Sequence, residues 1–291
     1  MAQSKTFTPA ERIRITEIIS RHILEPTTRD IFVEGHSDRA FIIWFSQSIK
    51  KPNIAVYSVD SIDIPNNAIP RGLSNSSNRT RNIALSIVLS EQLPSTANIR
   101  CIVDLDYEKY INKIFTNSFI RYTDYNSLEL YLLDECSIHK FLLLAACTDK
   151  PVAGTLKNLA EILRELFLLR LTGISLDWNM TWVKLEKYIT SSDKGLFLDL
   201  ERYLISFLTS NSRWAEKETF LVERERLRSL LSPDDRLSSR GHDFTELLYL
   251  LLVKNLKNSH FKLESVERTL MCCADVEELL REKLFQEIKS L

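Results

Sequence analysis

Glycine and proline are scarce in this sequence, with six glycines and eight prolines among 291 residues. So few turn-forming residues argue against a loop-rich all-β fold and favour long helices. Hydrophobic residues make up 44% and charged residues 26%, which is enough to form a core without disulfides or metal ions. At roughly 100–200 residues per domain, the length allows one large domain or two modest ones.

The sequence also lacks cysteine pairs with the spacing of a metal or redox site. The five cysteines are odd in number, and none belongs to a CxxC pair: Cys101, Cys136, Cys147, Cys272 and Cys273. Cys101 and Cys147 lie inside apolar runs. We therefore expect reduced, buried thiols in a cytosolic protein.

No segment has the pattern of a signal peptide or a membrane span. Residues 1–8 lack a basic segment followed by an apolar run. No stretch approaches the roughly 20 uninterrupted apolar residues that a membrane span requires. We therefore expect a cytoplasmic protein that does not contact a membrane.

The net charge of −1 neither requires nor excludes a nucleic-acid partner. Proteins that bind the phosphate backbone usually carry a basic excess. Binding of nucleic acid would therefore depend on local basic patches or on metal ions.

The first half of the chain alternates between predicted strands and predicted helices. Hydrophobic strands without polar alternation are typical of a parallel sheet that is covered by helices. The expected strands are 30–34, 53–59, 98–104 and 118–124, and the expected helices are 9–24, 38–49, 78–92 and 127–147.

From Pro151 onward the periodicity is helical, and the sequence pattern predicts no strand. The expected helices are 155–171, 181–190, 196–209, 214–231, 243–257 and 263–288. The sequence therefore predicts an α/β domain over residues 1–150, with an N-terminal helix at 9–24, and an all-helical domain over residues 151–291.

Acidic residues follow two of the expected strands. Glu34 ends the first strand, Asp104 ends the third, and Asp106 comes two residues later. Functional groups of parallel α/β sheets gather at the carboxyl ends of the strands. Converging carboxylates repel one another unless a cation lies between them, and Mg²⁺ prefers such oxygen ligands. The pattern predicts a Mg²⁺ site, which Mn²⁺ could also occupy, with these three residues as catalytic ligands.

An Asp-x-Asp motif after an apolar strand also occurs in phosphatases of the haloacid-dehalogenase type. That family places the motif near the first strand, with Thr or Val two positions after the second aspartate. Here the motif follows a late strand, and Glu108 occupies that position. The phosphatase interpretation is therefore disfavoured.

Glutamate after the first strand, followed by Asp-x-Asp after a later strand, resembles the Toprim domain of topoisomerases, bacterial primases and OLD nucleases. The resemblance covers about residues 28–150, and its first motif is similar to the Glu-Gly-x-x-Asp form of OLD-like nucleases. It implies that Asp38 and Glu129 join the metal ligands. The motifs are Val33-Glu34-Gly35-His36-Ser37-Asp38, Ile102-Val103-Asp104-Leu105-Asp106 and Asn126-Ser127-Leu128-Glu129.

The chain further resembles the compact Toprim effector nucleases of anti-phage defence, such as that of the PARIS system, in which a Gly-His-Asp element follows the Toprim core. Gly241-His242-Asp243 is similar to that element. The resemblance implies a toxic effector of abortive infection, an endonuclease that is active as a homodimer and is restrained by an ATPase partner. It favours RNA, including tRNA, over DNA as the nucleic-acid substrate. The chain has no P-loop, so any ATP dependence would come from another chain.

Several of these residues also have purely structural interpretations. Asp38 could be a helix-start acid that the helix dipole favours. Glu129 could be a first-turn helix residue, and His242 could precede an N-cap, with Asp243 capping a helix at 244–257. His36, in the turn beside Glu34, could contact substrate.

Three arginines, Arg71, Arg79 and Arg81, lie in or next to a turn-rich stretch that has no acidic residue over 64–82. They form the best candidate strip for contacts to phosphate, and a solvated loop is the alternative. For the whole protein, the alternative function is a catalytically silent Toprim scaffold that acts as a protein-interaction module. The intact acidic set argues against that alternative.

Overall fold

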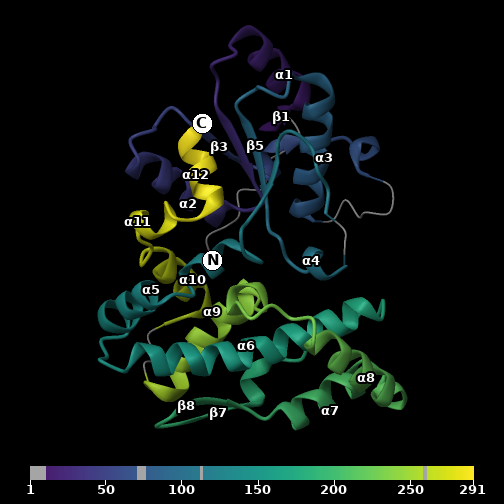
Figure 1. Cartoon of the computed structure of the whole chain (residues 1–291), viewed down its shortest axis with the longest axis vertical. Helices are drawn as coiled ribbons and strands as arrows, with labels where there is room; N and C mark the ends of the chain where they lie inside the picture. Colours follow the sequence, from purple (N-terminus) through teal and green to yellow (C-terminus); the bar gives the residue numbers. More distant parts are fainter. Residues whose placement is uncertain (1–10, 71–76, 112–113, 258–260) are drawn as a thin grey trace. The chain divides into compact units, whose positions relative to one another are not determined.

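A computed structural model describes residues 11–70, 77–111, 114–257 and 261–291 (Figure 1). The chain divides into two compact units. The first consists of Met1–Leu105, Lys113–Asp124 and Val276–Leu291, and the second of Asp106–Asn112 and Tyr125–Asp275. This division differs from the expected boundary at residue 150. Over the described ranges, no helix combines the length and the apolar character that crossing a membrane would need.

The first unit contains a four-stranded parallel sheet with the strand order β3-β2-β5-β6. Its central strands are hydrophobic and buried, as expected for a sheet that is covered on both faces. This confirms the predicted α/β class with a parallel sheet. The strands are β2 (Asp30–Val33), β3 (Ala55–Ser58), β5 (Ile99–Val103) and β6 (Ile120–Tyr122).

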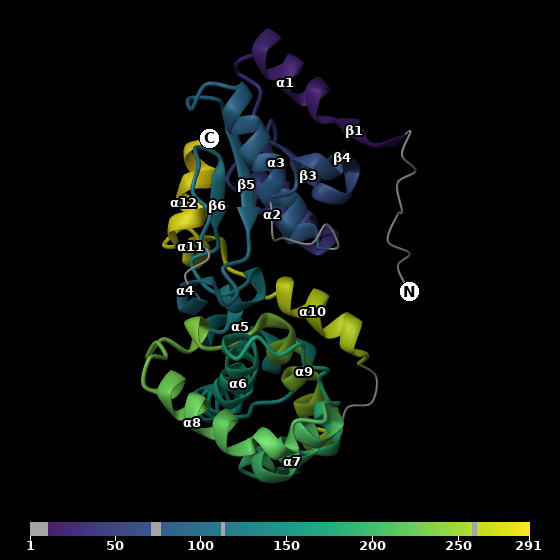
Figure 2. The same ribbon diagram turned by 90° about the vertical axis from the view of Figure 1, so that its right-hand side faces the viewer.

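Helices cover both faces of this sheet. One face packs against α1 (Ile15–Leu24) and α3 (Asn78–Gln92), and Phe32 and Cys101 belong to that core. On the other side, α2 (His36–Ser48) and α12 (Lys283–Ser290) are joined by edge-on contacts of Phe41 and Phe45 with Phe285. Both views show α12 and α3 on opposite sides of β5 (Figures 1 and 2).

The N-terminal helix is shorter than the expected 9–24. Residues 13–14 form β1 (Ile13–Arg14), which pairs in parallel with β4 (Ile62–Asp63), and α1 begins at Ile15. The backbone of Ile13 therefore bonds to a neighbouring strand, and this tertiary pairing overrides the helical periodicity. Residues 9–10 lie outside the described ranges.

The expected long helix at 127–147 is broken into three pieces. A 3₁₀ turn at Leu128–Leu132 is followed by α5 (Glu135–Lys140) and a π-helical turn at Phe141–Ala145. The Asp134 side chain accepts a hydrogen bond from the Ser137 N–H at 2.9 Å. This N-cap starts a new helix in the middle of the apolar run.

The second unit is helical, as expected for the C-terminal region, with a π-helical turn at Leu251–Asn255 after α9 (Gly241–Leu250). The expected helix at 263–288 divides into α10 (Leu263–Met271), α11 (Val276–Leu279) and α12, the last two of which belong to the first unit. The helices of the second unit are α4 (Glu108–Ile111), α5, α6 (Val152–Ser175), α7 (Leu200–Ser210), α8 (Lys217–Arg228), α9 (Gly241–Leu250) and α10 (Leu263–Met271).

The sequence pattern predicted no strand in this region, but the structure contains one antiparallel hairpin. It is formed by β7 (Ile189–Ser192) and β8 (Gly195–Leu198), where the C-terminal part of the helix at 181–190 and the start of the helix at 196–209 were expected. Gly195 has a φ of 124°, which a residue with a side chain rarely adopts. The Asn158 side chain accepts from the Leu196 N–H and donates to the Leu196 carbonyl, which holds β8 against α6.

One side chain of α3 joins the two central strands. The Asn82 amide donates to the carbonyls of Phe32, at 3.2 Å, and of Ile102, at 2.7 Å. Asn82 is fully buried, so these two hydrogen bonds are formed away from water. They tie the carboxyl-terminal halves of β2 and β5 to the same helix.

Replacing Asn82 with alanine should therefore destabilise the first unit. The substitution removes one hydrogen bond from each of two buried carbonyl oxygens. We therefore expect a loss of about 2–4 kcal/mol of unfolding free energy. Asn98→Ala is the control, because the Asn98 side chain makes one hydrogen bond of 3.5 Å to Pro26. That variant should lose less than about 1 kcal/mol. Urea unfolding measures both, and equal losses would show that the Asn82 bridge has no special role.

Candidate metal site at the ends of β2 and β5

Two acidic residues follow neighbouring strands of the first unit. Glu34 comes directly after β2 and Asp104 directly after β5, and the two strands pair in parallel, with Phe32 opposite Cys101. The Asp104 N–H donates to Glu34 Oε1 at 3.0 Å. The glutamate carboxylate of one strand end therefore lies against the backbone of the other.

Helix α3 fixes the backbone next to these acids. The Asn78 amide donates to the Glu34 carbonyl at 2.9 Å, and Asn82 lies one turn further along the helix. Sequence reasoning missed both asparagines. The available signal was their spacing of four residues, which places two amides on the same face of a helix.

Asp38 lies in the first turn of α2. Its Oδ2 accepts a hydrogen bond from the Gly35 N–H at 2.8 Å, and Gly35 is the N-cap residue of this helix. This is the contact of a helix-start acid, which the sequence allowed as an alternative. A role of Asp38 in binding metal stays a prediction. His36 is the first residue of the helix and is exposed.

Asp106 and Glu129 belong to the second unit, and we describe them within it. Asp106 has a φ of 49°, in the left-handed region that aspartate tolerates better than most residues. Its N–H donates to the Asn126 carbonyl at 2.9 Å. The Asn126 amide in turn donates to the Ser239 carbonyl at 2.8 Å, so this loop is held to the segment that precedes α9.

Glu129 is buried, and its carboxylate lies beside the first residue of α9. A Cβ atom on Gly241 would be 2.3 Å from Glu129 Oε2 and 2.3 Å from Ser127 Oγ. Position 241 therefore has no room for a side chain while Glu129 and Ser127 stay in place. A carboxylate at a helix N-terminus is also favoured by the helix dipole. The glycine of the Gly-His-Asp element thus permits close packing against Glu129.

Three buried oxygens lie in these same segments of the second unit. Asn126 Oδ1, Ser127 Oγ and Ser239 Oγ have no hydrogen-bond partner within the described ranges. Buried polar atoms are nearly always satisfied by protein, water or an ion. Together with the carboxylate of Glu129, these oxygens could act as ligands for water or for a hard cation.

The other two residues of the Gly-His-Asp element have different surroundings. His242 is exposed in the first turn of α9. Asp243 is buried and accepts two hydrogen bonds from Arg170, at 2.8 and 2.7 Å. The expected role of Asp243 as an N-cap is wrong, because α9 begins at Gly241 with Arg240 at the N-cap position. Asp243 binds an arginine instead.

The candidate phosphate-contacting strip is only partly described. Arg71 lies outside the described residues. Arg81 donates to the Ile62 carbonyl at 2.9 Å, and its pKa is lowered by burial and by the nearby Arg12. Arg81 therefore holds β4 in place, while Arg79 is half-buried in the first turn of α3. A contact of these arginines with substrate stays a prediction.

The fit of a metal ion depends on how many acidic side chains gather in one place. The part of the chain that the structure describes contains no group of three or more His, Cys, Asp or Glu side chains arranged to hold a metal. The contact between Glu34 and Asp104 joins two acidic residues. Mg²⁺ is usually bound through one or two carboxylates, with waters and substrate phosphates as its remaining ligands. Binding of Mg²⁺ or Mn²⁺ by Glu34 and Asp104 therefore stays a prediction.

No protein-family model matches the chain, and a search of curated proteins finds no significant match. The likeness to the Toprim domain consequently depends on the sequence motifs. The geometry adds the hydrogen bond between the backbone of Asp104 and the side chain of Glu34.

Gly241 offers a test of the packing around Glu129. Gly241→Ala should lose about 1–3 kcal/mol of unfolding free energy, because its Cβ displaces Glu129 or Ser127. Gly154→Ala, within α6 of the same unit, is the control, since a Cβ there meets nothing within 4 Å. That change should be stabilising by about 0.5–1 kcal/mol. Thermal and urea unfolding measure both variants. A change of the same sign in the unfolding free energy of both would contradict the close packing of Gly241 against Glu129.

Proposed function

We propose that this protein is a Mg²⁺-dependent endonuclease whose Toprim-like sheet binds the catalytic cation. The observation that carries the proposal is the hydrogen bond from the Asp104 N–H to Glu34 Oε1 at 3.0 Å. It places the glutamate of the first motif against the Asp-x-Asp motif. These motifs are about 70 residues apart along the chain, and the parallel pairing of β2 with β5 brings them to one sheet edge.

Each acidic residue has a defined part in this proposal. Glu34 and Asp104 bind the cation through their carboxylates, and the Asp104 N–H orients Glu34 by fixing one of its oxygens. Asp106, two residues further along the chain, and Asp38 and Glu129 are additional ligands on the basis of their motifs. When bound, such a cation activates water and stabilises the leaving oxygen in phosphodiester cleavage.

The resemblance to compact Toprim effectors suggests a role for this protein in the cell. The protein would be a toxic effector of anti-phage defence that acts by abortive infection. RNA, including tRNA, is its favoured substrate over DNA, and the active form would be a homodimer. An ATPase partner would restrain it until infection. Sequencing the nucleic acids that are cleaved on expression would identify the substrate directly.

The surface of α8 is a candidate contact for that partner. Arg224 and Arg228 both form ion pairs with Glu165 inside the second unit, so their charges are already balanced within the protein. The pKa of Glu165 is lowered because these pairs outweigh the opposing effect of burial. Val222 and Leu230 are 71% and 57% exposed, which leaves apolar surface next to these charges.

The metal hypothesis is tested by Asp104→Asn and Glu34→Gln. Both keep the size of the side chain, and the amide oxygen introduced by Glu34→Gln can still accept the Asp104 N–H, so only the charge that binds the cation is lost. Cleavage should fall by roughly 100-fold or more, because water activation depends on the ion. In EDTA the melting temperatures should equal or exceed that of the wild type, since less negative charge is gathered at the strand ends.

Added Mg²⁺ or Mn²⁺ should raise the melting temperature of the wild type but not of these variants. Asp63→Asn is the matched control, because Asp63 is an exposed carboxylate of the same unit. It should cleave and respond to metal like the wild type. If both site variants still cut nucleic acid, the endonuclease proposal fails. If the wild type binds metal but cuts nothing, the silent scaffold becomes the better interpretation.

Regulation is tested by co-expression with an ATPase encoded by a neighbouring gene. The partner should suppress the toxicity of the wild type, and Val222→Asp should weaken this suppression without reducing toxicity when the effector is expressed alone. Val222 is exposed on α8, so the change should not disturb the core. Toxicity that no neighbouring gene product alters would reject the restrained-effector model.

A further inference from the structure

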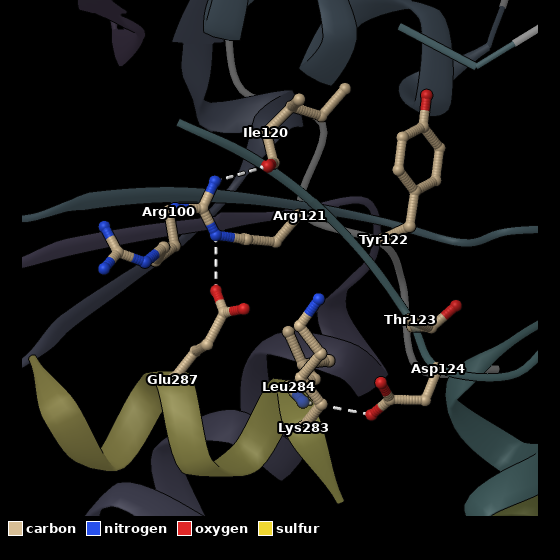
Figure 3. A pocket seen from close by; sticks show the side chains of 9 residues that line it. All are labelled: Arg100, Ile120, Arg121, Tyr122, Thr123, Asp124, Lys283, Leu284 and Glu287. Carbon is tan, nitrogen blue, oxygen red and sulfur yellow. Dashed lines mark hydrogen bonds and ion pairs between the residues drawn. The ribbon is translucent and has the colours of Figure 1, made fainter. Parts of the chain in front are cut away.

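A pocket of about 550 Å³ lies in the first unit, on the face of the sheet that α12 covers (Figure 3). Its volume is within the range of about 300–1,000 Å³ that is typical of small-molecule sites. It contains neither Glu34 nor Asp104, so it is separate from the proposed metal site. Its lining residues are Arg100, Ile120, Arg121, Tyr122, Thr123, Asp124, Lys283, Leu284 and Glu287.

Two arginines of the pocket share one face of the sheet. Arg121 pairs with Ile102 across β5 and β6. Arg100 lies two residues before Ile102, so its side chain points to the same face. Arg100 and Arg121 are therefore diagonal neighbours on this face, and Figure 3 shows both side chains in the pocket. Like charges at such positions oppose each other unless an anion lies between or beside them.

Both carboxylates of the pocket already accept hydrogen bonds from the protein. Glu287 accepts a hydrogen bond from Arg121 Nε, and Asp124 accepts one from the Leu284 N–H at 3.0 Å (Figure 3). Three cations and two carboxylates line the pocket, which leaves one positive charge in excess. Neither carboxylate forms an ion pair with Arg100 among those found in the described residues.

Arg100 is the residue without a matching acceptor. Its Nη1 donates to the carbonyl of the preceding Ile99 at 2.7 Å, while its Nε is buried and has no hydrogen-bond partner within the described ranges. Burial and the nearby Arg121 both lower the pKa of Arg100. Arg100 is half-buried, and its guanidinium is disfavoured by burial and by the nearby guanidinium of Arg121, while Glu287 opposes this effect. An oxyanion would supply the missing acceptor and further negative charge.

We propose that this pocket binds a phosphate group carried by a ligand of about mononucleotide size. Arg100 and Arg121 come from two paired strands and Lys283 from the helix that covers them, so cations line the pocket from both the sheet and the helix. A tetrahedral phosphate accepts from several directions at once, whereas a planar carboxylate offers two oxygens. The volume of the pocket exceeds what phosphate alone would fill, and the remainder accommodates the rest of the ligand.

The test is calorimetric titration of the full chain with inorganic phosphate, AMP and adenosine, in EDTA and at constant ionic strength. The wild type should bind phosphate and AMP saturably. AMP should bind more tightly than phosphate, because the pocket also holds the nucleoside. Equal affinities would contradict a ligand of mononucleotide size. The absence of saturable binding of either phosphate compound would overturn it.

Matched variants locate the binding in this pocket. Arg100→Gln should weaken phosphate and AMP binding by roughly tenfold or more, because it removes a charge-assisted hydrogen bond. Without ligand its melting temperature should be unchanged or higher, since repulsion from Arg121 is relieved. Lys283→Gln should weaken binding, while Lys289→Gln should not, because Lys289 is an exposed lysine of the same helix outside the pocket.

Glu34→Gln separates this site from the proposed nuclease site. It should bind phosphate like the wild type. The pocket could therefore be confirmed even if the protein proves to have no nuclease activity. Binding of AMP that Arg100→Gln leaves unchanged would show that the ligand lies elsewhere, and the proposal would then be rejected. Binding of adenosine as tight as that of AMP would reject it as well.

Discussion

Parallel pairing of β2 with β5 is the constraint on which the sheet and the candidate metal site both depend. Neighbouring strands lie about 4.8 Å apart, so residues that follow two paired parallel strands are brought close together whatever their charge. Here those residues are Glu34 and Asp104. Asn82 joins the same two strands from α3, and Asn78 holds the Glu34 carbonyl. The helix therefore supports the backbone at the point where the acids gather.

Electrostatics explains why this arrangement favours a cation. Two unit charges about 4 Å apart repel by about 4 kcal/mol at an effective dielectric constant of about 20. One hydrogen bond to a charged group contributes about 1.5–3 kcal/mol. If the carboxylates of Glu34 and Asp104 turn toward each other, the hydrogen bond from the Asp104 N–H therefore offsets only part of their electrostatic repulsion. A divalent cation would offset the remainder, and its binding would draw the carboxylates together.

The strand ends could be predicted from the sequence because they follow from local pattern. Short β-branched runs that end in acidic residues gave β2 and β5 within a residue or two, and parallel topology then placed Glu34 beside Asp104. Features that arise from distant segments could not be predicted in this way. Ile13 pairs with Ile62, which turns an expected helix into a strand. Gly195 turns the chain within a hairpin that replaces the end of one expected helix and the start of the next.

The Gly-His-Asp element illustrates the same limit at the level of single residues. By resemblance, Gly241-His242-Asp243 was interpreted as a single element. In the structure Gly241 makes room for Glu129, whereas Asp243 binds Arg170. Arg170 is 73 residues away in sequence, so no local pattern could have assigned this partner. The basic pocket depends in the same way on α12, which returns to the sheet from the end of the chain.

The central claim is that Glu34 and Asp104 bind a divalent cation, and anomalous diffraction from crystals soaked in Mn²⁺ tests it most directly. We expect an anomalous peak at the carboxyl ends of β2 and β5, about 2.1 Å from oxygens of both carboxylates. The peak should be lost in Glu34→Gln crystals soaked identically. A Mn²⁺ ion bound elsewhere, with none at this edge of the sheet, would show that Glu34 and Asp104 do not form the cation site.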